Sequence, residues 1–449
     1  MSDFYKKSSL IYAALIILIQ VIFLLQPISG SHKWRQADTA AVARNFALES
    51  ANIFYPRVDV REDKTGITGM EFPLYQYITS LFFKAFKSDS DQIPKTLSFV
   101  FTGLFIFLLS LILKQHFGIE RLLSIPILLS SPMLIEYGTK VLPDPLALLC
   151  LALSFFFYFK ASKKKYWGIV FFSLTILIRP YLILWGFWFL YDFYVGIKKR
   201  REWQKPLLYG LLSLIPFMAW YFYWNPYLRS NFGMPHYFNV GLNIKENFKY
   251  FLDINVYLFF IKTSFKNYIG WFLVPSALLS LFIMRKSFFM LLLAFLIMII
   301  IISGNHFIVH NYYLYAFLPL LLFGVLKRHE LMKYKFERKK SVLVFLLLLL
   351  INGISSKTHF LTKSRYYQNE WSDEFISQVK IKTKETDLFV VPNRGSFPYH
   401  LYSVRRRGWS VAQAKLSDIN YLRNLKKKGA KWAILLNNQK PQLLDLDSI

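Results

Sequence analysis

Long apolar runs separated by short polar loops repeat along most of this chain. The runs that approach the length needed to cross a bilayer lie near residues 10–28, 93–113, 122–136, 144–159, 167–178, 181–197, 206–224, 269–284, 288–303, 312–326 and 341–354. This pattern predicts about eleven membrane-spanning helices. Several runs are short, which is compatible with helices that border a water-filled cavity.

The basic residues of the chain gather in one set of loops. Hydrophobic residues make up 55% of the 449 residues, and the net charge of +29 would by itself be compatible with nucleic-acid binding. Lys and Arg, however, concentrate in loops 114–121, 160–165, 198–205, 285–286 and 327–340, whereas the short opposite loops hold only Lys140 and Arg179. By the positive-inside rule we expect a cytoplasmic N-terminus, an external C-terminal segment and no nucleic-acid partner.

The first loop, residues 29–92, is expected to be external and to hold two helices, at 38–50 and 72–86, joined by a polar turn region around 59–69. Segment 72–86 is apolar and aromatic. If it crossed the membrane, every later basic loop would change sides. We therefore expect this segment to lie in the interface plane with its aromatic rings at headgroup level.

The last part of the chain, residues 357–449, is more polar and carries β-like runs at 388–391 and 432–436, with a helix-like segment at 416–428 that ends before Gly429. The predicted fold is an all-α polytopic membrane bundle, residues 1–356, followed by a small α/β extracytoplasmic domain, residues 357–449. The single cysteine, Cys150, excludes an intrachain disulfide, and we interpret it as core or lipid-facing filler.

Ionisable residues just after the first apolar run are the first candidates for chemistry, because charge at a membrane boundary is costly unless it is paired or functional. Asp38 stands at the expected start of a helix, so it is either a helix cap with Arg35 as its partner or a catalytic carboxylate. Glu71 is the only acid in its apolar neighbourhood. It is either a rim carboxylate or a second catalytic group.

Two further residues are expected at the same face. Asp144, in Pro143-Asp144-Pro145, opens the fourth predicted span and is either a cap or part of a site. Arg179 lies between two spans with no acid nearby in sequence, so it either extends to lipid headgroups or binds an anion such as a lipid phosphate.

His306 and His310 are spaced to share one helix face, which permits a metal pair, but no Glu stands between them to complete a zinc-hydrolase motif. Hydrogen bonding to a phosphate or a sugar is the better hypothesis, so we expect no metal site. Polar groups from four distant external elements then indicate one cavity at the membrane–water boundary. Such a cavity would suit a substrate with a lipid tail and a polar head.

Short motifs in these elements resemble the GT-C superfamily of glycosyltransferases, in the branch of the lipid A aminoarabinose transferases and protein O-mannosyltransferases. The resemblance covers about residues 8–330 and rests on Trp34-Arg35-Gln36-Ala37-Asp38, Glu71-Phe72-Pro73-Leu74, Pro143-Asp144-Pro145 and His310-Asn311-Tyr312-Tyr313-Leu314. Relatives often carry a Lys that contacts the lipid phosphate where this chain has Phe72, so Arg179, another cation or Lys64 must supply that charge here.

The resemblance implies a multi-pass enzyme of the bacterial inner membrane that transfers a sugar, with inversion, from a polyprenyl-phosphate donor to a hydroxyl of a lipid, glycan or protein acceptor at the external face. It implies Asp38 as the base, with Glu71 as a second catalytic residue. The substrate-binding residues would be Arg35, Asp144, Arg179, His306, His310, Tyr312 and Tyr313. We expect no cofactor, although a divalent metal ion occurs in some relatives.

Two other functions stay open from the sequence. A flippase or exporter of lipid-linked saccharide usually has internal repeats and buried charge along a path through the bilayer. No repeat is visible here, and the charges gather at one face. A polysaccharide polymerase or ligase would place its key groups in a large late loop, whereas this chain places its acids in the first loop.

Overall fold

The computed structural model describes residues 3–26, 28, 32–160, 163–199, 203–232, 371–393, 398–437 and 440–449, with short stretches at 253–256, 258, 273, 311–316, 318 and 346–352. The chain divides into two compact units. The helical unit comprises residues 1–25, 96–219 and 239–359. The mixed unit comprises residues 26–95, 220–238 and 360–449.

Apolar helices build the described part of the helical unit. They are α1 (Asp3–Leu24), α4 (Gln92–Phe117, which begins in the mixed unit), α5 (Arg121–Leu129), α6 (Pro132–Tyr137), α7 (Asp144–Tyr158), α8 (Trp167–Ile178), α9 (Phe187–Lys198) and α10 (Gln204–Met218), with 3₁₀ turns at Lys163–Tyr166, Pro180–Gly186 and Asn311–Ala316. A π-helical stretch, Ala219–Trp224, joins α10 to α11 (Asn225–Phe232).

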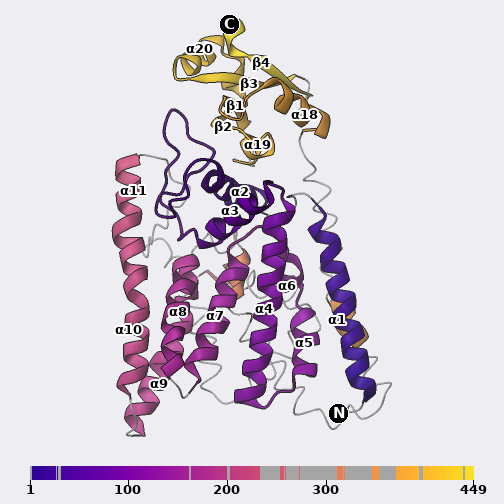
Figure 1. Cartoon of the computed structure of the whole chain (residues 1–449), viewed down its shortest axis with the longest axis vertical. Helices are drawn as coiled ribbons and strands as arrows, with labels where there is room; N and C mark the ends of the chain where they lie inside the picture. The colour runs from indigo at the N-terminus through magenta and orange to yellow at the C-terminus, as the bar shows by residue number, and fades with distance from the viewer. Residues whose placement is uncertain are drawn as a thin grey trace. The chain divides into compact units, whose positions relative to one another are not determined.

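Helices α7 and α8 run side by side, and α10 packs on α8 (Figure 1). A small residue makes this close packing feasible. A Cβ added to Gly168 would lie 1.7 Å from the Tyr209 hydroxyl and 2.7 Å from the Ser154 carbonyl oxygen. The Ser154 hydroxyl donates to the Gly168 carbonyl at 2.9 Å, which links α7 to α8 through a buried hydrogen bond.

The predicted spans agree only partly with the helices of the structure. Among the described residues, three helices are long and apolar enough to cross a membrane: Lys6–Leu24, Gln92–Phe117 and Gln204–Phe232. Predicted span 122–136 is broken between α5 and α6, where Pro132 opens the second helix and has no N–H to continue the first. Predicted span 181–197 begins with the 3₁₀ turn before α9. The last four predicted spans fall mostly outside the described residues.

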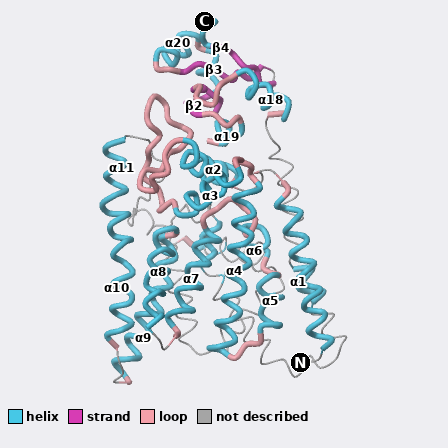
Figure 2. The backbone as a smooth tube through the Cα atoms, viewed as in Figure 1, coloured by secondary structure: helices cyan, strands magenta, loops and turns pink. Residues whose placement is uncertain are grey.

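The first loop folds as part of the mixed unit. Its helices are α2 (Lys33–Leu48) and α3 (Leu74–Phe86), which pack on each other. Figure 2 shows the long irregular connection between them. Both helices were predicted. Helix α2 begins five residues earlier than expected, and Lys33, Arg35, Gln36 and Ala37 in the added turn are good helix formers.

A small sheet forms the other part of the mixed unit. Its strands lie in the order β2-β1-β3-β4 among the described residues, with the first three parallel and β4 antiparallel. The elements are α18 (Asp373–Lys382), β1 (Leu388–Asn393), α19 (Tyr399–Ser403), β2 (Arg407–Ala412), α20 (Ile419–Lys427), β3 (Ala430–Asn437) and β4 (Lys440–Asp445), with 3₁₀ turns at Gln413–Ser417 and Leu446–Ser448. The expected α/β character of this segment is confirmed.

Backbone hydrogen bonds tie the first loop to the edge of this sheet. The Gly408 N–H donates to the Asp59 carbonyl at 3.0 Å, and the Arg61 N–H donates to the Gly408 carbonyl at 2.9 Å. Gly408 has φ +143°, and a Cβ there would lie 2.1 Å from the Phe389 carbonyl oxygen. The first loop therefore shares a compact unit with residues 360–449. The boundary expected at residue 356 stays a prediction.

Candidate functional site

Helix α2 carries the first candidate residues in its opening turns. Arg35 and Asp38 are one helical turn apart, and both side chains are almost fully buried. Asp38 lies in the second turn, and the helix is preceded by His32 in a left-handed conformation. The interpretation of Asp38 as a helix cap is therefore wrong, because the helix starts before it.

One guanidinium group joins two carboxylates in this region. Arg35 Nη1 donates to Asp38 Oδ2 at 3.2 Å, and Arg35 Nη2 is hydrogen-bonded to Glu71 Oε1. Gln76 Nε2, on α3, also donates to Glu71 Oε1, at 3.4 Å. Glu71 is only 7% exposed, so the interpretation of it as a rim carboxylate is wrong. We call Arg35, Asp38 and Glu71 the first acidic cluster.

The two oxygens of Asp38 have different surroundings. Oδ2 is bonded to Arg35, whereas Oδ1 has no hydrogen-bond partner within the residues that the structure describes. Burial raises the pKa of Asp38 to about 7, with Arg35 opposing the rise and Glu71 and Asp59 adding to it. A carboxylate with that pKa and one unbonded oxygen is suited to take a proton near neutral pH.

A second cluster, formed by Asp144, Arg179 and Tyr181, lies in the helical unit. Asp144, the first residue of α7, is hydrogen-bonded to Arg179 Nη2 through Oδ2 and accepts from the Tyr181 hydroxyl through Oδ1 at 2.7 Å. The Tyr312 ring lies 5.4 Å from the Arg179 guanidinium carbon, and the Tyr313 ring lies 5.0 Å from that of Tyr181. Four of the predicted substrate-binding residues are thus brought together.

Two expectations about this cluster need correction. Arg179 has no acid nearby in sequence, but it is ion-paired with Asp144 across 35 residues and its side chain is 6% exposed. It therefore does not extend to lipid headgroups. One oxygen of the Asp144 side chain is bonded to Arg179 and the other to Tyr181, so this side chain does not cap the backbone of α7.

Of the remaining candidates, the structure describes Phe72 but not the two histidines. His306 and His310 lie outside the described residues. Phe72, which stands where relatives often carry a Lys, packs edge to face on Trp220 with ring centroids 5.0 Å apart. No group of three or more His, Cys, Asp or Glu side chains suited to a metal ion occurs in the part of the chain that the structure describes.

The sequence analysis did not identify Tyr181 or the Arg44–Asp59 ion pair as parts of these regions. Tyr181 follows Arg179-Pro180 directly, and its position beside the arginine was a signal that a hydroxyl partner was at hand. The ion pair between Arg44 and Asp59, with Nη2 and Oδ2 2.5 Å apart, joins α2 to the following loop. Its residues are 15 positions apart and belong to no motif, so the sequence offers no signal for it.

Comparisons with known proteins agree with this architecture. Residues 70–224 match the family described as dolichyl-phosphate-mannose-protein mannosyltransferase. A comparison with curated protein sequences found no match.

Solved structures are similar over most of the chain. ArnT from Cupriavidus metallidurans bound to undecaprenyl phosphate is 12% identical with a TM-score of 0.59, covering 96% of this chain and 93% of that one. Its apo form is 13% identical with a TM-score of 0.57 and the same coverage. The archaeal oligosaccharyltransferase AglB from Archaeoglobus fulgidus, in complex with an inhibitory peptide and a dolichol-phosphate, is 10% identical with a TM-score of 0.54, covering 97% of this chain and 70% of that one.

These likenesses show that the chain has the fold of ArnT and of the oligosaccharyltransferase AglB. The resemblance that the short motifs predicted is confirmed by the family match over residues 70–224 and by this likeness of fold.

Proposed function

We propose that this protein transfers a sugar from a polyprenyl-phosphate donor to an acceptor hydroxyl, with inversion, and that Asp38 is the base. The observation that carries the proposal is the unbonded, buried Oδ1 of Asp38 in a carboxylate whose pKa is about 7. The GT-C fold and the solved relatives that hold undecaprenyl phosphate or dolichol-phosphate support the class of donor.

The chemistry balances with the residues at hand. The acceptor oxygen attacks the anomeric carbon, the bond from that carbon to the phosphate oxygen breaks, and the hydroxyl proton passes to Asp38. The lipid phosphate leaves with the bonding electron pair, so it needs a cation. A positioned base typically contributes about 10²–10⁴-fold to such a step.

The other residues take supporting roles in this proposal. Arg35 fixes the orientation of Asp38 through the 3.2 Å bond, and Glu71 holds Arg35 from its other side. Arg179 is our proposed contact for the donor phosphate, oriented by Asp144, with Tyr312, Tyr313 and the two histidines nearby in sequence as contacts to the donor.

We also propose that the chain crosses the bacterial inner membrane about eleven times, with the N-terminus inside and residues 357–449 outside. Single-cysteine labelling of intact cells tests this topology on a Cys150→Ser background. A cysteine at Thr65 should react with an impermeant reagent and one at Lys164 should not. External labelling at position 164 would overturn the topology.

The function itself is tested by mass spectrometry of envelope glycans from cells with and without the protein. Loss of one sugar modification, restored by the parent protein and by Asp38→Glu better than by Asp38→Asn, is the expected result. Glycans that are unchanged when the protein is absent would count against sugar transfer. Release of polyprenyl phosphate from labelled donor by the purified protein then identifies the donor.

A further inference from the structure

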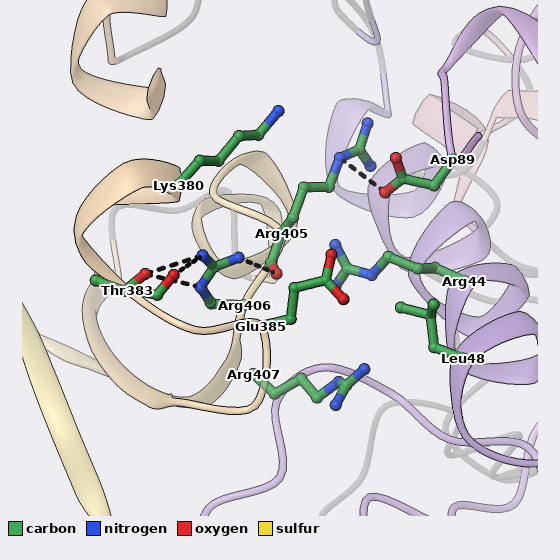
Figure 3. A pocket seen from close by; sticks show the side chains of 9 residues that line it. All are labelled: Arg44, Leu48, Asp89, Lys380, Thr383, Glu385, Arg405, Arg406 and Arg407. Atoms are coloured by element: carbon green, nitrogen blue, oxygen red, sulfur yellow. Dashed lines mark hydrogen bonds and ion pairs between the residues drawn. The ribbon is translucent and has the colours of Figure 1, made fainter. Parts of the chain in front are cut away.

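The mixed unit contains a cavity of about 240 Å³ that has no role in the proposed sugar transfer. Its walls come from α2, α18, β2 and the loops beside them, and Figure 3 shows the side chains that line it: Arg44, Leu48, Asp89, Lys380, Thr383, Glu385, Arg405, Arg406 and Arg407. Five of these side chains are cationic, and two are carboxylates. The cavity therefore gathers positive charge from parts of the chain that are more than 300 residues apart.

Some of this charge is balanced locally. Arg405 contacts Asp89 at 3.3 Å and Asp91 at 2.8 Å, so it is fully paired. Arg407 contacts Glu49 at 2.9 Å. That same carboxylate also serves Arg57 at 3.1 Å and Arg61 at 2.6 Å. Glu49 is therefore shared among three guanidinium groups, of which only Arg407 lines the cavity, so it neutralises the charge of Arg407 only in part.

Arg406 is buried without a counter-ion in the described residues. It is 2% exposed and donates to the Thr383 hydroxyl and carbonyl and to the backbone carbonyls of Val404 and Arg405. Burial lowers the pKa of Arg406, Glu385 opposes this, and the charge of Arg44 adds to it. Neutral acceptors thus hold the side chain in place without cancelling its charge.

Arg44 presents an unbonded donor to the same cavity. Its Nη2 is bonded to Asp59 at 2.5 Å, but its buried Nη1 has no hydrogen-bond partner within the described part of the chain. The side chain is 2% exposed, and Figure 3 shows it reaching from its helix toward the middle of the lining residues. A buried guanidinium N–H without an acceptor is unfavourable, and an anion in the cavity would satisfy it.

We propose that this cavity is a binding site for a phosphate-bearing anion, bound by Arg44 Nη1 and Lys380, with the buried charge of Arg406 adding electrostatic attraction. A hydrogen bond from a guanidinium N–H to a phosphate oxygen is charge-assisted, and a lysine on the exposed rim adds a mobile charge. The site is independent of the proposed sugar transfer, because none of its residues takes part in that reaction. The same chemistry would be supplied by a free phosphate or by the headgroup of an anionic phospholipid.

Pyrophosphate binding to the full-length protein in phosphatidylcholine nanodiscs, measured by calorimetry, tests the proposal. Lys380→Glu should weaken binding about five- to tenfold, because it reverses a charge at the exposed rim. Glu385→Gln should tighten binding about threefold, because it removes an opposing carboxylate. Both positions are exposed, so these variants should fold.

Lys440→Glu is the matched control, since Lys440 is an exposed lysine of the same unit that does not line the cavity. It should leave pyrophosphate affinity unchanged. Absence of saturable pyrophosphate binding by the parent protein would overturn the site. Equal effects of Lys380→Glu and Lys440→Glu would also overturn it, since binding would then follow overall charge. Asp38→Asn should bind pyrophosphate normally, which separates this result from the proposed sugar transfer.

Competition distinguishes the two sources of the anion. Displacement of pyrophosphate by water-soluble dihexanoyl phosphatidic acid, but not by inorganic phosphate at equal concentration, assigns the site to a lipid headgroup. Displacement by inorganic phosphate with equal or greater potency assigns it to a soluble phosphate. Displacement by neither would contradict a phosphate site.

Discussion

Asp38 and Asp59 are two buried carboxylates of the mixed unit that differ in how completely their oxygens are bonded. Asp59 accepts from Arg44 Nη2 through one oxygen and from Asn45 Nδ2, at 3.0 Å, through the other. Asp38 is bonded through Oδ2 alone, and its Oδ1 is left without a partner within the described residues. Because a buried acceptor without a partner is costly, Asp59 has the features of a structural residue and Asp38 those of a functional one.

The same comparison separates Asp38 from Asp144. Both oxygens of Asp144 are bonded, one to Arg179 and one to the Tyr181 hydroxyl. Asp144 therefore resembles Asp59 in its bonding and is suited to orient Arg179. Only the first acidic cluster, as far as the described residues go, combines a buried carboxylate with an unbonded oxygen in a predicted catalytic position.

The largest expected effect is on turnover in the Asp38→Asn variant. Loss of the base should reduce sugar transfer by at least about 10²–10⁴-fold, while expression and donor binding stay near those of the parent protein. Release of polyprenyl phosphate at saturating donor measures it. Near-normal turnover in this variant would remove Asp38 from the mechanism, and Glu71→Gln would then be the next variant to examine.

Asp59→Asn should instead reduce stability. It leaves Arg44 buried without its carboxylate, and breaking one partner out of a buried pair typically costs about 3–5 kcal/mol. Its melting temperature in detergent, followed by tryptophan fluorescence, should fall well below that of the parent, whereas Asp38→Asn should melt at or above it. The contrast between these two carboxylates fails if Asp38→Asn is the less stable variant.

Arg179→Ala should weaken donor binding more than it slows transfer at saturating donor. A charge-assisted hydrogen bond to phosphate is worth about 1.5–3 kcal/mol, which corresponds to about ten- to a hundredfold in affinity. Arg179→Lys should recover only part of this, since a point charge cannot reproduce the planar guanidinium. Donor titration of the purified protein measures the effect.

Tyr181→Phe is the matched control for Arg179. It removes the other hydrogen bond to Asp144 without changing any charge. Donor affinity should therefore change much less in Tyr181→Phe than in Arg179→Ala. Equal losses in the two variants, or none in Arg179→Ala, would mean that the cluster is structural and that the phosphate contact lies elsewhere.

How much of this could be predicted from the sequence depends on the distance between partners. Arg35 and Asp38 are one helical turn apart, so their pairing could be predicted from the motif. The β-like runs at 388–391 and 432–436 were also predicted, and they form parts of β1 and β3. The start of α2 was missed because Asp38 was treated as a helix cap, whereas Lys33, Arg35, Gln36 and Ala37 before it are good helix formers.

Contacts across long stretches of chain could not be predicted. Arg179 finds Asp144 across 35 residues, and Arg405 finds Asp91 across 314, because tertiary packing and not local pattern brings these side chains together. A lone arginine in an apolar stretch signals only that some anion is near. Which anion it is follows from the fold.

The smallest and most specific expected effect is on the pH dependence of kcat/KM, which reports the pKa of the free enzyme. Burial raises the pKa of Asp38 to about 7, and a base is active when ionised, so kcat/KM should rise as the pH increases through 7 and be about tenfold lower at pH 6 than on its plateau. Arg35 lowers the pKa of Asp38 and Glu71 raises it. Arg35→Gln should therefore move the profile to higher pH, and Glu71→Gln should move it to lower pH. Shifts of opposite sign in these two variants would identify the titrating group as Asp38, whereas an unmoved profile would assign the titration to another group.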